Sequence, residues 1–184
     1  MRVTLTLLLL CGLIAPAAKS QSLTGDDIKT QMLKDWQRAK AYTLDYLNTM
    51  PADKYSFKPV DSIRSFAQQM LHLTGGNYFL ISTATGAQMP GMRDLEHSPG
   101  AQSKDSVIYY VTASYDFAIQ AIKNFDPSKL GEMVTLRNFK ETRFAMLEKA
   151  FEHQTHHRGQ ATIYIRLQGI RPPNERLFEA PNMD

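Results

Sequence analysis

The chain of 184 residues is long enough for one domain and leaves little room for a second. Apolar residues make up 43% of it, which is enough to bury an ordinary core without disulfides. The formal net charge is +3, and no basic run or interleaving of basic and aromatic residues is present. Charge therefore gives no reason to expect nucleic acid as a partner.

Residues 1–20 have the pattern of an export signal. A short positive region at Arg2 precedes the apolar run 5–14, and small residues dominate 15–20. This order is typical of a secretory signal peptide, and the apolar run is too short to span a bilayer comfortably. We therefore predict cleavage near residue 20 and a periplasmic or secreted domain of residues 21–184. The alternative is an uncleaved N-terminal anchor.

Cys11 is the only cysteine, and it lies inside the predicted signal. A mature chain without cysteine excludes disulfides, thiolate zinc ligands and a cysteine nucleophile. The sequence also shows no Ser-His-Asp set, glycine-rich phosphate loop or paired carboxylates. Any catalysis would need another kind of site.

Four long segments have helical composition, with apolar residues at near-helical spacing, over roughly 26–50, 62–83, 103–124 and 142–167. Thr24 can cap the first segment, and Ser62 and Ser65 offer capping hydroxyls to the second. Gly169 ends the fourth. These features predict four helices.

The segments between the helices are of mixed length. Residues 133–136 look like a short extended piece, and the 84–102 connection is long and rich in glycine and proline. Together with the helices, these connections predict an all-α four-helix bundle. We expect the 84–102 connection to border the mouth of a pocket.

Three of the five histidines lie in one nonapeptide, E-H-Q-T-H-H-R-G-Q at residues 152–160. Side chains four positions apart share a helix face, so His153 and His157 can converge on one metal ion. His156 points about 100° away from His157 around the helix. A His153–His156 pair, three positions apart, is the second choice.

A metal site with open positions usually takes three protein ligands. His72 lies in the middle of the second predicted helix beside Met70 and Leu73, where a histidine needs a hydrogen bond or a ligand. His97 lies in the 84–102 connection. We favour His72 as the third ligand because a helix positions a side chain more rigidly. Spacing alone also permits a bundle without metal, in which hydrogen bonds satisfy these histidines.

The zinc-protease motif H-E-x-x-H has the same spacing as His153 and His157, but its glutamate activates water. Here the corresponding residue is Gln154, which cannot act as a base. The sequence therefore argues against a protease-like mechanism. If the site hydrolyses a substrate, the metal ion itself must lower the pKa of its bound water.

These elements together resemble the DinB/YfiT-like superfamily, the DNA-damage-inducible DinB family. The likeness rests on H-x-x-x-H-R-G-Q at residues 153–160 and on His72 in the second predicted helix. The stretch F-K-P…I-R-S-F at residues 57–66 adds to it. The similarity extends over nearly the whole mature chain.

The resemblance implies a four-helix bundle with an uncommon connection order that binds a divalent metal ion, commonly zinc or nickel. The implied ligands are His72, His153 and His157. Weaker candidates for a place beside the ligands or in the pocket are His156, Arg158, Gln160 and Tyr164.

For Arg158 and Gln160 the alternative is a structural bond to a neighbouring helix or loop, which we favour slightly. Tyr164 lies two turns beyond His157, near the same helix face. Gly159 in mid-helix would allow another helix to approach closely.

Characterised members of the family include transferases and isomerases that use low-molecular-weight thiols such as bacillithiol or mycothiol. The resemblance therefore implies an exported metal-dependent hydrolase or thiol-dependent transferase that acts on a small molecule, although export departs from the cytosolic setting of those thiols. The alternative is a non-catalytic exported bundle that binds metal or a small ligand. Such bundles commonly form homodimers, but no feature of this sequence requires one.

Overall fold

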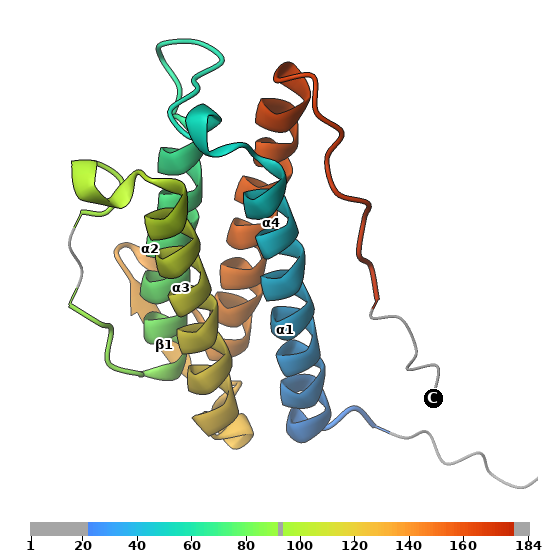
Figure 1. The fold of residues 1–184 in the computed structure, drawn as a ribbon. Helices are drawn as coiled ribbons and strands as arrows, with labels where there is room; N and C mark the ends of the chain where they lie inside the picture. Colours follow the sequence, from blue (N-terminus) through green and yellow to red (C-terminus); the bar gives the residue numbers. More distant parts are fainter. Residues whose placement is uncertain (1–21, 92–93, 179–184) are drawn as a thin grey trace, which may run out of the picture.

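The computed structural model describes residues 22–91 and 94–178 (Figure 1). Its helices and strands are α1 (Gly25–Thr49), α2 (Phe66–Thr85), α3 (Lys104–Asn124), β1 (Met133–Leu136), β2 (Phe139–Thr142) and α4 (Arg143–Leu167). Short 3-10 helices lie in the connections at Ala52–Lys54, Pro99–Ala101 and Pro127–Lys129. The predicted all-α four-helix bundle is confirmed. The predicted export signal lies outside the described residues, and no helix within them has the length and apolarity of a membrane span.

The four helices are joined in an unusual order. α1 packs against α3 and α4, and α2 packs against the same two helices, so α1 and α2 lie across the bundle from each other. The connection 86–103 returns along the length of the bundle, so α2 and α3 run in the same direction (Figure 1). As a result α4 runs antiparallel beside α2 although α3 and a hairpin separate them in the sequence.

Each long helix begins after a hydroxyl residue whose side chain accepts a hydrogen bond from a first-turn amide, namely Thr24, Ser65, Ser103 and Thr142. Such caps satisfy amides that have no partner within the helix. The start of α2 nevertheless differs from the predicted residue 62. Its first two amides donate to the carbonyls of Phe57 and Tyr55, at 3.0 and 2.9 Å. The preceding loop therefore fixes the first turn at Phe66.

A small antiparallel hairpin leads into α4. The predicted extended piece is β1, but its partner β2 was not predicted as a strand. Leu136 pairs with Phe139 across the turn, and Arg137 between them has a positive φ of 53°. The hairpin packs against α2 and α4.

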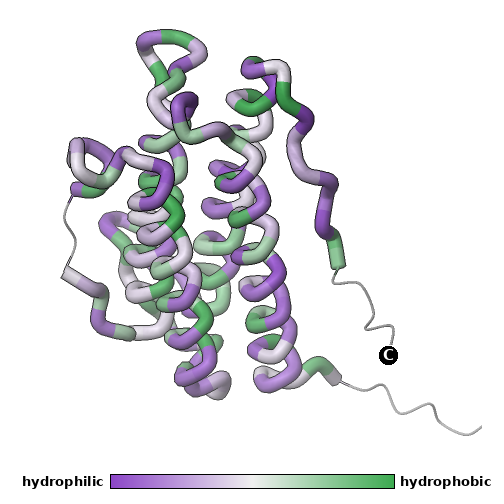
Figure 2. Tube along the Cα trace, viewed as in Figure 1, coloured by the Kyte–Doolittle hydropathy of each residue, from purple (hydrophilic) through white to green (hydrophobic). Residues whose placement is uncertain are grey.

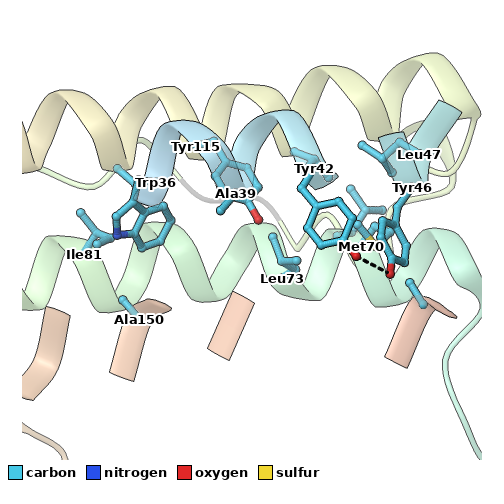
Figure 3. Close-up of a cluster of buried hydrophobic side chains, with 14 of the residues drawn as sticks. Trp36, Ala39, Tyr42, Tyr46, Leu47, Met70, Leu73, Ile81, Tyr115 and Ala150 are labelled. Atoms are coloured by element: carbon cyan, nitrogen blue, oxygen red, sulfur yellow. Dashed lines mark hydrogen bonds between the residues drawn. The ribbon is translucent and has the colours of Figure 1, made fainter. Parts of the chain in front are cut away.

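Aromatic side chains dominate the middle of the core (Figure 3). The Trp36 ring makes edge contacts with the rings of Tyr115 and Phe151, both with centroids 5.7 Å away. Farther along α1, the hydroxyls of Tyr42 and Tyr46 lie 3.4 Å apart. Hydrophilic and hydrophobic residues alternate along each helix, as expected when one face is buried (Figure 2).

Candidate metal centre

Three imidazoles converge where α2 and α4 lie side by side. His72 on α2 and His153 and His157 on α4 each offer a nitrogen, and the three nitrogens lie within 4.8 Å of one another. The ring centroids are 4.4 Å apart for His153 and His157, 4.6 Å for His72 and His157, and 5.4 Å for His72 and His153. The group could hold a metal ion.

The ring of His153 lies directly over Gly76, one turn after His72 on α2. A Cβ atom at position 76 would lie 2.0 Å from Cε1 and 2.3 Å from Nδ1 of His153. Only glycine therefore leaves space for this imidazole. The Nδ1 atom of His153 is buried and has no hydrogen-bond partner among the described residues.

His153 and His157 are held in the neutral form. Burial, followed by the charges of His72, His156 and Arg64, lowers the pKa of His153 to about 4. Burial and the neighbouring His153 lower the pKa of His157 to about 3. Neutral imidazole is the form that binds a metal ion.

The loop before α3 supports His72 from outside the bundle. The carboxylate of Glu96 lies 2.9 Å from Nδ1 of His72 and accepts a 2.6 Å hydrogen bond from Nε of Arg64. Although burial opposes it, the hydrogen bonds from Arg64 and His72 hold the pKa of Glu96 below its ordinary value. Nδ1 of His72 also lies 3.1 Å from Nη2 of Arg64, but its shorter contact with the ionised Glu96 assigns the proton to Nδ1, which leaves Nε2 free to bind a metal ion.

A second polar side chain on α2 supports His157. The amide of Gln69 lies 2.9 Å from Nδ1 of His157 and also contacts the side chain of Gln160. Gln160 continues the chain of contacts to Nε2 of His156, at 3.0 Å. Gln160 therefore contacts the ligand set through Gln69, while the exposed His156 lies outside the group of three.

Two pockets open beside the histidines. One, of about 460 Å³, is lined by His72 and His153 together with residues 94–96 of the long connection. The other, of about 620 Å³, is lined by His153 and His156. The expected place of the 84–102 connection at a pocket mouth is confirmed.

The remaining weak candidates, Arg158 and Tyr164, lie outside the group of three imidazoles, although Tyr164 lines with Gln160 a third pocket, of about 750 Å³, that Gln69 and Glu96 also border. Arg158 is buried on the opposite face of α4, where it donates to Oε1 of Gln154 at 3.0 Å and lies 4.7 Å from the ring centre of Tyr42. Tyr164 donates from its hydroxyl to the carbonyl of Arg64 at 2.9 Å. Arg158 thus connects α4 to α1, and Tyr164 fastens the segment before α2.

Two further expectations concerned Gly159 and His97. A Cβ at Gly159 would meet no atom within 4 Å, so the expected close helix approach there is wrong. The close approach occurs at Gly76 instead. His97 is exposed and bonded to Asp94, with 2.8 Å between Nδ1 and Oδ2, which agrees with its rejection as a ligand.

Three residues at the site were not singled out from the sequence: Gln69, Gly76 and Glu96. Gln69 and Gly76 lie three positions before and four after His72, so helical spacing from that histidine would have located both. Glu96 is adjacent to the rejected His97, and nothing in its local sequence indicates a contact with His72.

Comparisons with known proteins agree with this architecture. The model of the DinB family matches residues 20–181. A DinB-like protein from Bacillus cereus ATCC 10987 has a TM-score of 0.69 at 18% identity, covering 80% of this chain and 97% of its own. A DinB-like protein from Bacillus subtilis gives a TM-score of 0.61 at 18% identity, and the match covers 80% of this chain and 96% of that protein.

A conserved protein from Enterococcus faecalis gives a TM-score of 0.60 at 19% identity, covering 76% of this chain and 96% of its own. These identities show a shared fold. The chain matches no curated protein. With the family match extending over nearly all of its length, the chain belongs to the DinB family.

Proposed function

We propose that this protein is an exported metal-binding protein that holds one divalent ion, zinc or nickel, through His72, His153 and His157. The observation that carries the proposal is the convergence of three nitrogens within 4.8 Å. Three imidazole nitrogens with remaining open positions form a donor set that suits zinc and nickel. The ion would serve chemistry on a small molecule.

The buried environment fits such an ion. The orphaned Nδ1 of His153 would otherwise be a desolvated polar atom without a partner, which is costly. The space above Gly76 admits this ring and no side chain besides it. Glu96 fixes the tautomer of His72, as carboxylates commonly do for histidine ligands.

The same requirement assigns the orientation of Gln69. If His157 binds the ion through Nε2, its Nδ1 carries the proton and must donate it. Gln69 then turns its Oε1 toward His157, and Gln160 donates its amide to that same oxygen. Amide orientation is assigned from such networks and not observed directly. In this arrangement the contacts of Gln69 with Nδ1 of His157 and with Gln160 each join a donor to an acceptor, whereas its 3.4 Å contact with the carbonyl of His157 is given up.

The carboxylates that line the smaller pocket, beside His72 and His153, are engaged by other side chains, and the unpaired Glu141 lies at the larger pocket. Of the two acids that line the smaller pocket, Glu96 is engaged by Arg64 and His72, and Asp94 by His97. The bound ion would therefore supply the activation by lowering the pKa of a water or of a substrate thiol. This supports a metal-dependent hydrolase or a thiol-dependent transferase, and the engagement of both acids of the smaller pocket favours transfer from a thiol, which needs no carboxylate base.

Metal analysis of untagged protein tests the proposal. Full-length protein purified without a histidine tag should carry close to one equivalent of zinc or nickel after exposure to the ion and gel filtration. His157→Ala should lose it, and His156→Ala, which removes the neighbouring exposed imidazole, should keep it. Equal and negligible metal in wild type and His157→Ala would rule the site out.

A second experiment separates catalysis from plain metal binding. Holo and chelated protein are compared on electrophiles with thiols, and on esters and amides. Turnover that disappears with the chelator and returns with the ion supports an enzyme. Turnover that survives chelation contradicts this mechanism, and none in either form favours the non-catalytic bundle.

A further inference from the structure

The two pockets beside the histidines meet at the tip of the hairpin. Both are lined by Leu80 of α2, by Leu136 and Phe139 of the hairpin, and by His153. They therefore adjoin along one line of side chains that includes a predicted metal ligand. A molecule bound at the histidines could extend into either pocket while remaining in contact with the protein.

Apolar side chains dominate both spaces. The smaller pocket adds Leu71, Phe79 and Leu95. The larger adds Ala145 and Met146. Lys149 and Glu152 at the edge of the larger pocket are paired with each other. Arg137 at the smaller pocket and Glu141 at the larger one have no ion-pair partner among the described residues, so unpaired charge at the two pockets is confined to these two residues of the hairpin.

Phe139 is unusually exposed for its place. It retains 66% exposure at the turn, although its ring borders both pockets. Phe79 on the facing helix α2 retains 39%. Exposed aromatic side chains grouped around a hollow are typical of a surface that a ligand covers.

We propose that the substrate at the metal centre carries an extended apolar group, an alkyl chain or aryl system, that lies across the hairpin tip in these two pockets. The polar group that reacts lies at the histidines. Volumes of about 460 and 620 Å³ each lie within the range of sites for small molecules. The proposal rests on the metal centre proposed above and adds the class of substrate.

Chain-length series test it. Straight-chain alkyl hydroxamates, whose head group binds zinc and nickel, are titrated into the metal-loaded full-length protein by calorimetry. Each added methylene buried in the groove should tighten binding by about three- to fourfold. In Phe139→Ala the long chains should lose about tenfold in affinity, while acetohydroxamate binds as in wild type.

Tyr109→Ala is the matched control, because Tyr109 on α3 is 67% exposed and borders neither pocket. It should leave the whole series unchanged. A parallel series of unbranched alkanols, which lack a metal-binding head, is titrated into chelated protein. The affinity for these alkanols should also increase with chain length, and Phe139→Ala should reduce that increase.

The two series make failures distinguishable. Hydroxamate affinities that do not change with chain length in metal-loaded protein overturn the apolar substrate and leave the metal centre intact. If the protein binds no metal but its affinity for alkanols still depends on chain length, the apolar pockets are supported and the metal centre is ruled out. A concentration-dependent dimer that Phe139→Ala dissociates would assign the hairpin to a second copy of the chain and overturn the proposal.

Discussion

The imidazole of His153 occupies the volume that a side chain at Gly76 would fill. A Cβ atom at position 76 would lie 2.0 Å from Cε1 of His153. This single relationship joins the two helices at the metal centre. Gly76 follows His72 by one turn, so the ring that it admits lies beside the histidine of the same helix.

Gly76→Ala should therefore weaken metal binding without disturbing the fold elsewhere. The methyl group displaces the His153 ring, and we expect the affinity for zinc to fall by at least about tenfold, in the range seen when support of a ligand is lost. Competition with a chromophoric chelator measures this.

Gly159→Ala is its control, because a Cβ there meets nothing within 4 Å. That variant should keep wild-type affinity and raise the free energy of unfolding by up to about 1 kcal/mol through helix propensity. Equal affinities for Gly76→Ala and wild type would show that His153 does not bind the ion from this position.

Glu96→Gln should reduce metal affinity through His72. The oxygen of the neutral amide is a weaker acceptor for the Nδ1 proton and forms no ion pair with Arg64, so the tautomer and orientation of the imidazole are held less firmly. Loss of such a carboxylate typically lowers affinity by about 10- to 100-fold. The matched variant is Asp94→Asn, whose partner His97 is exposed. It should change affinity little, and an equal loss in both variants would point to a general effect of loop charge.

Acid should destabilise the metal-free protein over a defined range. The folded-state pKa values of His153 and His157 are about 4 and about 3, below the ordinary value of 6.5. Between these values and 6.5 the unfolded chain binds more protons than the folded chain, so the free energy of unfolding rises with pH. The stability that the neutral histidines contribute is therefore lost progressively as the pH falls below 6.5. Urea unfolding in chelator from pH 7 to 4.5 should show this slope. His153→Gln should flatten it, and an unchanged slope would contradict the neutral assignment.

Arg158→Ala should separate stability from metal binding. The guanidinium stacks on Tyr42 and donates to Gln154, away from the histidines. We expect a loss of about 2 kcal/mol or more in the free energy of unfolding. Metal affinity should remain at the wild-type value. If the variant is fully folded and still binds metal more weakly than wild type, Arg158 acts at the metal site.

The fold was largely predictable because its signals are local. Hydroxyl caps and apolar spacing lie within each helix, so the four helices follow from the sequence. The start of α2 did not, because its first amides are satisfied by the carbonyls of Phe57 and Tyr55, a contact set by the loop. β2 escaped prediction because its turn places Arg137 at positive φ, where glycine or asparagine would have announced a hairpin.

The site divides in the same way. His153 and His157 share a helix face at a spacing that sequence shows directly, and His72 followed from its apolar surroundings. Glu96 reaches His72 only because the long connection folds back over α2. Gly159 makes no packing contact, so its place in the motif gave a wrong prediction, and Gly76, where the close approach does occur, was not singled out.

The crossed connection order has a consequence for how the centre assembles. All of α3 and the hairpin are synthesised between His72 and His153, so an emerging chain holds one donor long before the other two. A lone imidazole retains metal poorly, and the ion can be captured firmly only after α4 has docked. Once bound, it would fasten the last helix to the second and slow its departure, since a ligand specific to the native state adds its binding free energy to stability. Metal loading would then mark the molecules whose final helix is in place.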